Sequence, residues 1–497
     1  MTDLVPKRAP AALLGALALF GLLVRLWPFL SGSALAYPMD YDEGVYFSAA
    51  GLLARGVLPY RDFVFVHPPG LLWFLATSAA WPADPSRLFA LSRFIAAGLG
   101  GASVYLAGRT AQRAGGLLAG AVAALLYALY PEAVGVERGP FLEPVLNLAC
   151  LAFAAVWLGN TEDGKARRPL LAGALLGVSV AVKVWAGAWV IAGLASLPRK
   201  ERSRAALQLA LGAVAAYAVL VLPLALRAPR AFVTQTLLFH ALRPKDGTPA
   251  GVGRMLEMVH VGHRVAPVLA AVALLSLPWR VRRGDGARTE RLFVTAWLVT
   301  LLGFLLSSSY WRQYNAALAG CEAVLAGLGA QALWNALGGR ARPLRVVGLI
   351  GLALGLRRPL REVRHDAAQR MPEQPALARL LHERVPPDAC LFALEPGWGV
   401  LGGRWPKEPA GAPLVVDSYG AQLLAAAQTG ARYPDTGAAF ADSSSQAPVR
   451  PLLVGCDYLV LGGRGEWQLS AESRATAAAG HAPLPGPEGL PVLGPRR

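Results

Sequence analysis

The sequence has 497 residues, of which 55% are hydrophobic and only 16% are charged. This balance excludes an ordinary soluble enzyme and indicates a polytopic membrane protein. The formal net charge is +17, which in a soluble protein would suggest nucleic-acid binding. No basic face with interleaved aromatic residues occurs, so we expect no nucleic acid among the partners.

Apolar segments follow one another from the N-terminus to about residue 358. Each is long enough, or nearly so, to cross ~30 Å of hydrocarbon. The predicted fold class is therefore a polytopic α-helical membrane protein. We expect about 11 transmembrane helices, at 9–30, 86–108, 114–131, 141–159, 169–182, 184–198, 205–226, 263–279, 291–309, 314–337 and 344–358.

The first apolar segment permits two interpretations. It could be a signal peptide, because Ala34-Leu35-Ala36 offers a small-residue cleavage pattern. We favour an uncleaved span, because the apolar run is long and further spans follow. Arg25 inside the segment is unusual for either interpretation.

Basic clusters separate several of the predicted spans. The positive-inside rule places these clusters in the cytoplasm. We therefore expect a multi-pass protein of the plasma (inner) membrane with a cytoplasmic N-terminus, and with everything after about residue 359 outside. The clusters are Arg109/Arg113, Lys165/Arg167/Arg168, Arg199/Lys200/Arg202/Arg204, Arg280/Arg282/Arg283/Arg288/Arg291 and Arg340/Arg342/Arg345.

The first outer loop, residues 31–85, is the most informative segment. It carries three carboxylates within four positions, namely Asp40, Asp42 and Glu43. Acidic groups beside a bilayer are costly unless they face water or a substrate. The cluster is therefore the first candidate for chemistry.

Three roles are open for these carboxylates. One of them could take the proton of an acceptor hydroxyl or amine during sugar transfer. The spacing of Asp40 and Asp42 could instead hold a divalent metal. Alternatively, Asp42 or Glu43 caps a helix, although a cap explains only one carboxylate. We expect interfacial helices over Glu43–Arg55 and Leu71–Trp81.

Two residues of the second outer loop, Arg138 and Glu143, are further candidates. The planar guanidinium of Arg138 could bind a phosphate oxygen. Glu143 lies at the outer end of a predicted transmembrane helix. The alternative is a surface ion pair, which would contribute little to stability.

The stretch from Pro169 to Pro198 lies between two basic loops, so it crosses the membrane twice or not at all. We expect two short helices with Lys183 at their junction. Alternatively, one long tilted helix carries a snorkelling lysine. Arg243 and Arg312 lie on the same side as Lys183, and all three could hold a lipid-linked phosphate or face lipid instead.

The chain after about Arg361 differs in composition, and its mixed pattern predicts a small α/β domain. Cys390 and Cys456 could form a disulfide if this part is exported, or they could be two buried thiols. No glycine-rich phosphate loop occurs there, so nucleotide binding has no support. We expect a helix at Gln374–Arg384 and strands at Ala389–Leu394, Leu414–Asp417 and Cys456–Leu461.

Taken together, these motifs resemble the membrane-embedded GT-C glycosyltransferases. The similar branch includes protein O-mannosyltransferases, lipid A aminoarabinose transferases and RgtA/B/C/D-like enzymes, and is glycosyltransferase family 39-like. The resemblance covers roughly residues 10–358, so we expect the catalytic domain over residues 1–358 and, from the change in composition, a separate extracytoplasmic domain over residues 359–497. It rests on Asp42-Glu43, Pro59–Asp62 with His67–Gly70, Arg138 with Glu143-Pro144, Gly173–Lys183 and Tyr310–Tyr314.

The resemblance implies an inverting transfer from a polyprenyl-phosphate sugar at the outer membrane face. Asp42 would act as the base and Glu43 would support the loop, while Arg138 and Lys183 would meet the phosphate. A divalent metal is possible, with Asp40 and Asp42 as its ligands. The acceptor, whether glycan, lipid or protein, stays open. The candidate substrate- or phosphate-binding residues are Asp40, Arg61, His67, Arg138, Glu143, Lys183, Arg243, Arg312 and Tyr314.

Three other functions compete with this prediction. A transporter of lipid-linked substrates would carry charges within paired spans and show repeat symmetry. A membrane scaffold would tolerate replacement of Asp42. A cell-wall polysaccharide polymerase or arabinosyltransferase of another GT-C branch would share the same motifs.

Overall fold

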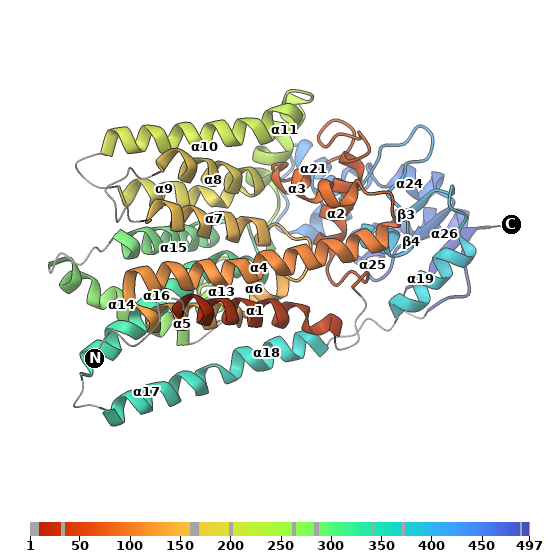
Figure 1. The fold of residues 1–497 in the computed structure, drawn as a ribbon. Coiled ribbons are helices and arrows are strands. Elements are labelled where there is room, and N and C mark those ends of the chain that lie inside the picture. Colours follow the sequence, from red (N-terminus) through yellow and green to blue (C-terminus); the bar gives the residue numbers. More distant parts are fainter. Residues whose placement is uncertain are drawn as a thin grey trace. The chain divides into compact units, whose positions relative to one another are not determined.

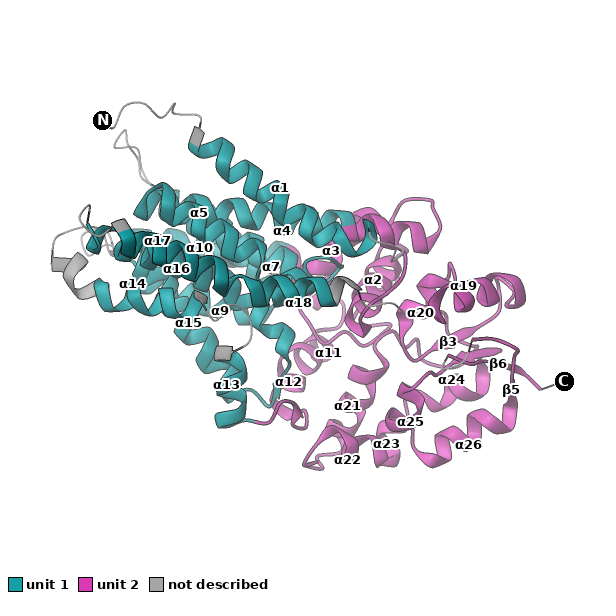
Figure 2. Cartoon of the chain, turned by 90° about the horizontal axis from the view of Figure 1, so that it is seen from below, with its two compact units in different colours: residues 1–32, 94–219, 250–369 teal, residues 33–93, 220–249, 370–497 magenta. Residues whose placement is uncertain are grey.

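The computed structural model describes residues 9–30, 35–159, 168–197, 202–260, 265–282, 288–338, 342–368, 373–487 and 490–496. The protein is mostly helical, at 72%. The chain divides into two compact units, each built from three segments (Figure 2). Unit 1 comprises residues 1–32, 94–219 and 250–369, and unit 2 comprises residues 33–93, 220–249 and 370–497.

Unit 1 is a bundle of helices that run side by side (Figure 1). Its elements are α1 (Ala9–Leu30), most of α4 (Pro85–Gly115), α5 (Leu117–Ala128), α6 (Pro131–Val136), α7 (Glu143–Trp157), α8 (Pro169–Val182), η1 (Val184–Ala186), α9 (Gly187–Ala195), most of α10 (Arg202–Ala225), α13 (Val252–His260), α14 (Val265–Arg282), α15 (Arg288–Leu306), β2 (Ser309–Tyr310), η4 (Arg312–Leu318), α16 (Ala319–Ala336), α17 (Arg342–Gly355) and α18 (Arg357–Ala368). Within the bundle, α5 and α14 pack against α16, α7 packs against α8, and α1 packs against α5.

The helices agree with the predicted multi-pass membrane protein, whereas the number of 11 crossings stays a prediction. Six shorter apolar helices accompany the longer ones in the described part of the chain. Five helices are long and apolar enough to cross a membrane: Pro10–Leu30, Pro85–Gly115, Ser203–Ala225, Arg288–Leu306 and Arg312–Ala336.

The predicted break at Lys183 is confirmed. The helix α8 ends at Val182, and Lys183 has an extended backbone with φ −152° and ψ 129°. The turn η1 and then α9 follow it. The alternative of one long tilted helix is therefore wrong.

Glycines allow α8 and α10 to approach each other closely. A β-carbon at Gly177 would overlap the backbone carbonyl of Ala213, and one at Gly212 would overlap the carbonyl of Leu170. Gly173, four residues before Gly177, shows the same close approach. Lipid supplies no hydrophobic driving force between helices, so such backbone contact is a main source of their association.

Replacing Gly177 by alanine is expected to lower the stability by ~1–3 kcal/mol, because the added methyl group forces the two backbones apart. Thermal unfolding of the purified protein in detergent measures the effect. Gly187→Ala is the matched control, because nothing lies within 4 Å of a β-carbon at that position. Equal unfolding temperatures for the two variants would contradict this packing.

Unit 2 combines the first outer loop with the C-terminal part of the chain. Its elements are α2 (Tyr41–Leu53), α3 (Gly70–Ala79), the first turns of α4, the last turns of α10, α11 (Pro229–Val233), the π-helical turn η3 (Thr234–Leu238), α12 (Phe239–Leu242), β1 (Asp246–Gly247), α19 (Glu373–Arg384), β3 (Leu391–Ala393), α20 (Pro396–Leu401), α21 (Ser418–Gln428), α22 (Thr436–Ala441), α23 (Ser443–Gln446), α24 (Arg450–Gly455), β4 (Tyr458–Val460), α25 (Arg464–Gln468), α26 (Ala471–Gly480), β5 (His481–Pro483) and β6 (Val492–Pro495).

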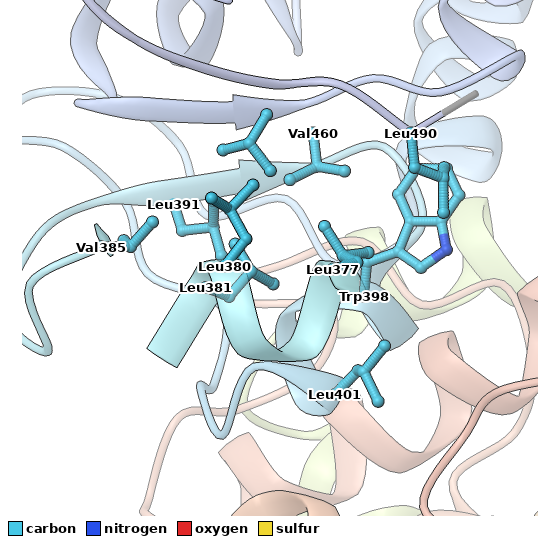
Figure 3. Close-up of a cluster of buried hydrophobic side chains, with 10 residues drawn as sticks. Leu377, Leu380, Leu381, Val385, Leu391, Trp398, Leu401, Val460 and Leu490 are labelled. Carbon is cyan, nitrogen blue, oxygen red and sulfur yellow. The ribbon is translucent and has the colours of Figure 1, made fainter. Parts of the chain in front are cut away.

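The C-terminal strands form a mixed sheet in the order β3-β4-β6-β5. The strands β3 and β4 are parallel, and β6 is antiparallel to both of its neighbours. One face of this sheet packs against α19 through a buried cluster that includes Leu377, Leu381, Trp398 and Val460 (Figure 3). This apolar layer gives the C-terminal segment of unit 2, residues 370–497, a core of its own.

The predicted strands at Ala389–Leu394 and Cys456–Leu461 are present as β3 and β4. The prediction of a strand at Leu414–Asp417 is wrong. There Asp417 caps α21, and its carboxylate accepts a hydrogen bond from the Gly420 amide. Sequence reasoning also missed β5 and β6, because both are short and contain proline.

A disulfide joins Cys390 to Cys456 across 66 residues of sequence. Each cysteine precedes one of two strands that run parallel to each other, Leu391 pairing with Tyr458. The strand register therefore brings the two thiols together, and of the two possibilities left open by the sequence the structure has the bonded one.

Candidate active site

The first carboxylate of the outer loop is the N-cap of α2. The side chain of Asp40 accepts a hydrogen bond of 2.9 Å from the Asp42 amide, and its backbone is extended. The sequence suggested Asp42 or Glu43 as the capping residue, and the structure instead gives this role to Asp40. Within the described ranges, no group of three or more His, Cys, Asp or Glu side chains is arranged to hold a metal ion.

Glu43 is fully buried and forms an ion pair of 2.6 Å with Arg93. The same carboxylate oxygen accepts a 2.8 Å hydrogen bond from the Met39 amide, and Arg93 donates to the carbonyl of Tyr37. Both charges lack access to solvent, so their mutual pairing and hydrogen bonds compensate their desolvation. Glu43 therefore holds the start of α2 against α4.

Asp42 differs from Glu43 in its exposure. Its side chain is partly exposed in the first turn of α2, and that of Asp40 is exposed. Of the three predicted carboxylates, these two are the ones that solvent reaches. Asp42 is thus accessible at the start of α2, while Glu43 is enclosed.

Sequence reasoning missed the residues that surround Tyr41, which lies between the two aspartates. The Tyr41 hydroxyl donates a 2.8 Å hydrogen bond to Asp417. The guanidinium of Arg464 lies 4.0 Å from the Tyr41 ring centroid and pairs with Glu395 at 2.9 Å. These partners are more than 350 positions away in sequence, and no local pattern signals them.

The buried groups around Tyr41 have shifted pKa values. Burial raises the pKa of the Asp417 carboxyl, although the hydrogen bonds from Gly420 and Tyr41 oppose this. Burial also raises the pKa of Glu395, which Arg464 opposes and the negative charge of Asp40 reinforces. The hydrogen bonds of the Tyr41 hydroxyl, rather than these shifts, show that the start of α2 contacts the C-terminal segment within unit 2.

The other candidates in unit 2 have partners of their own. Arg61 is paired with the adjacent Asp62 on the surface. The His67 imidazole lies 3.2 Å from the Tyr46 hydroxyl, and its ring centroid is 5.6 Å from that of His240. These contacts place His67 in a packed ring cluster.

Arg243 is also engaged within unit 2. It pairs with Asp246, whose carboxylate accepts a 2.8 Å hydrogen bond from the Tyr419 hydroxyl. The segment around β1 therefore attaches to the start of α21.

Three predicted residues come together in unit 1. The Lys183 ammonium donates a 2.7 Å hydrogen bond to Glu143, and it lies 4.7 Å from the ring centroid of Tyr314. Lys183 owes its position to the break between α8 and η1, and Glu143 is the first residue of α7. The predicted Glu143, Lys183 and Tyr314 thus form one cluster, although they are far apart in sequence.

Arg312 and Arg138 occupy different surroundings in unit 1. Arg312 pairs with Glu132 of α6 at 2.9 Å and with Glu362 of α18 at 2.8 Å. Arg138 is buried, with 9% of its surface exposed, in the loop after α6. Arg312 therefore joins two helices through carboxylates.

A second feature that sequence reasoning missed is the fully buried pair of Arg25 and Glu137. The guanidinium donates to one Glu137 oxygen at 2.9 and 2.5 Å. The other oxygen accepts hydrogen bonds from the Tyr127 hydroxyl at 2.7 Å and from the Asn147 amide at 2.9 Å. The unusual arginine in the first apolar segment thus has a specific partner in the second outer loop.

The fold is similar to solved structures of membrane proteins. ArnT from Cupriavidus metallidurans, bound to undecaprenyl phosphate, has a TM-score of 0.62 and 18% identity over 98% of each chain. Its apo form has a TM-score of 0.61 and 17% identity over 96% of this chain and 97% of that one. The oligosaccharyltransferase AglB from Archaeoglobus fulgidus, in complex with an inhibitory peptide and a dolichol-phosphate, has a TM-score of 0.60 and 13% identity over 99% of this chain and 74% of that one.

No family model matches the sequence, and no curated protein does. The solved structures nevertheless define the fold, because they belong to the GT-C superfamily and their similarity extends over nearly all of this chain. The chain therefore has the GT-C fold that these structures share. The resemblance predicted from the sequence motifs is confirmed for the fold.

Proposed function

We propose that the protein is a membrane glycosyltransferase that moves a sugar from a polyprenyl-phosphate donor to an acceptor on the outer face of the membrane. The proposal depends on one observation, which is the carboxylate-bearing turn of Asp40 and Asp42 at the start of α2 in a GT-C fold. The similar ArnT was solved with undecaprenyl phosphate, a lipid of the proposed donor class. A lipid-linked donor needs no nucleotide site, in keeping with the lack of a phosphate loop in the sequence.

In the proposed reaction, Asp42 takes the proton of the acceptor nucleophile while that nucleophile attacks the anomeric carbon. The bond from the sugar to the lipid phosphate breaks on the opposite face, so the configuration inverts. The phosphate leaves without protonation, and cations stabilise its charge. Lys183 and Arg138 are the candidates for this task, and Glu43 with Arg93 keeps the start of α2 in place.

We place unit 2 outside the cytoplasm. Its Cys390–Cys456 disulfide supports this location, because disulfides form and persist in oxidising compartments. The positive-inside assignment of the basic loops leads to the same orientation.

Transfer from polyprenyl-phosphate donors tests the proposal directly. The purified protein in lipid nanodiscs receives polyprenyl phosphates that carry labelled hexoses or pentoses, together with candidate glycan, lipid and peptide acceptors. The expected result is label that leaves the lipid, with no transfer from the corresponding nucleotide sugars. If label stays on every lipid donor, the proposal is wrong and a transporter or scaffold becomes the better explanation.

Lys183→Met is expected to raise the KM for the donor about tenfold or more, because a charge-assisted hydrogen bond contributes roughly 1.5–3 kcal/mol. Steady-state kinetics against donor concentration measures this. Lys407→Met is the control, since Lys407 is exposed and donates only to the Asp388 carbonyl among the described contacts. The double variant with Glu143→Gln shows whether the effect comes from the unpaired carboxylate, in which case the double variant recovers.

A further inference from the structure

Besides the pair of Glu43 and Arg93, residues of the C-terminal segment hold the start of α2. The side-chain amide of Gln374 donates a 2.6 Å hydrogen bond to the carbonyl of Pro38. Gly44 lies so close to Gly397 of α20 that a β-carbon on Gly44 would overlap the Gly397 backbone. Both contacts lie within unit 2. The first fixes the backbone before Tyr41, at Pro38, and the second fixes it after Tyr41, at Gly44.

Tyr41 itself makes the most specific of these contacts. Its hydroxyl donates to Asp417 at 2.8 Å, accepts from the Tyr419 amide at 3.0 Å and lies 3.3 Å from the Ser418 hydroxyl. All three partners belong to the first turn of α21 and its cap. The Tyr41 hydroxyl is therefore held by the N-terminus of a single helix, α21.

The face of the Tyr41 ring is fixed as well. The Arg464 guanidinium lies 4.0 Å from the ring centroid, and Glu395 at 2.9 Å holds that guanidinium in place. A cation over the face of an aromatic ring is attracted by the ring quadrupole. Tyr41 is thus held at its hydroxyl by α21 and at its ring by α25.

The geometry of a helix connects this contact to the carboxylates. Residues three apart, such as Tyr41 and Gly44, lie on the same helix face, and the structure shows both against the C-terminal segment. Asp42, the next residue, is turned away from that face by about 100°. A fixed Tyr41 therefore fixes the direction in which the Asp42 side chain leaves the helix.

We propose that the C-terminal segment positions the candidate catalytic loop through Tyr41, with Asp417 and Arg464 as positioning residues. This role rests on the proposed function, since it assigns the segment to the orientation of Asp42 toward the acceptor. Neither Asp417 nor Arg464 reacts with substrate. Each acts on the reaction only through Tyr41, and neither role follows from the motifs of the first outer loop.

The test combines kinetics with hydrogen exchange on the full chain in nanodiscs. Tyr41→Phe is expected to lower kcat by roughly 10- to 100-fold with an unchanged KM for the donor, because a misplaced catalytic group costs rate and not donor binding. Hydrogen exchange in the first turns of α2 is expected to rise in the same variant. Arg450→Ala, which breaks an exposed ion pair with Glu472 in unit 2, is the control and should change neither readout.

Two variants of Asp417 separate positioning from a general loss of structure. Asp417→Asn keeps an oxygen that accepts from Tyr41 and from the Gly420 amide, so it should keep most of kcat. Asp417→Leu removes that oxygen and should reproduce the effect of Tyr41→Phe on kcat and on exchange. Equal kcat values for the two Asp417 variants would overturn the proposal.

Hydrogen exchange tests the Tyr41 contact independently of activity. Faster exchange at α2 in Tyr41→Phe shows that this contact holds the helix start, and loss of kcat in the same variant supports the positioning role. Unchanged exchange in both Tyr41→Phe and Asp417→Leu would overturn it. A wild type that transfers no sugar would contradict the proposed function, while the exchange data would still show whether the C-terminal segment holds α2.

Discussion

Asp42→Asn is expected to lower the rate of sugar transfer by ~10²–10⁴-fold, the range that a general base contributes. Asparagine has nearly the same shape but cannot take a proton from the acceptor. The KM for the donor should change little, because Asp42 does not hold the lipid phosphate in the proposed mechanism. Single-turnover transfer from a labelled polyprenyl-phosphate sugar measures the chemical step.

Two control variants make this result specific. Asp435→Asn makes the same chemical change at an exposed N-cap of α22, where asparagine also caps well, so transfer should stay at the wild-type rate. Asp40→Asn likewise keeps the cap of α2 and should retain much of the activity. Full activity in Asp42→Asn with loss of activity in Asp40→Asn would contradict the mechanism and assign the base to Asp40.

Glu137→Leu is expected to destabilise the protein by ~3–5 kcal/mol, because it leaves the buried charge of Arg25 without its partner. Arg25 and Glu137 have no exposed side-chain surface, and Arg25 belongs to an apolar helix. A charge in such surroundings is tolerated when it is paired. Thermal unfolding in detergent, combined with the yield of monodisperse protein, measures the loss.

The double variant Arg25→Leu/Glu137→Leu tests whether the unpaired charge causes the loss. Apolar residues in place of both partners remove the buried charge, so the double variant should be clearly more stable than Glu137→Leu alone. Glu472→Leu is the control for a carboxylate paired on the surface, and it should have little effect. A double variant as unstable as Glu137→Leu would show that Tyr127 and Asn147, rather than the charge, need the carboxylate.

Local features of the fold could be predicted from the sequence, because neighbouring residues determine them. The helix predicted over Glu43–Arg55 is α2, which begins two residues earlier because Asp40 caps it. The break at Lys183 followed from the spacing of the basic loops, and the helix at Gln374–Arg384 is α19. Hydrophobic patterns and charge placement carry this information within a short stretch of chain.

The assignment of partners could not be predicted, because it depends on which distant elements the fold brings together. Arg25 looked unusual in the sequence, but nothing near it identified Glu137, 112 residues away, as its partner. Tyr41 is not among the residues predicted for the site, and its contact with Asp417 spans 376 residues. The sequence leaves open whether Arg312 holds a lipid-linked phosphate or faces lipid, whereas its partner Glu132 is 180 residues away and is evident only in the folded chain.

The number of free thiols in the protein would indicate on which side of the membrane unit 2 lies. The chain has four cysteines, of which Cys390 and Cys456 are bonded, and Cys150 and Cys321 are buried thiols. Alkylation of unfolded, unreduced protein would therefore label two thiols when unit 2 has reached an oxidising compartment, and four when it has stayed in a reducing one. The mass of the alkylated chain would give the orientation of the C-terminal segment in living cells without a fused tag.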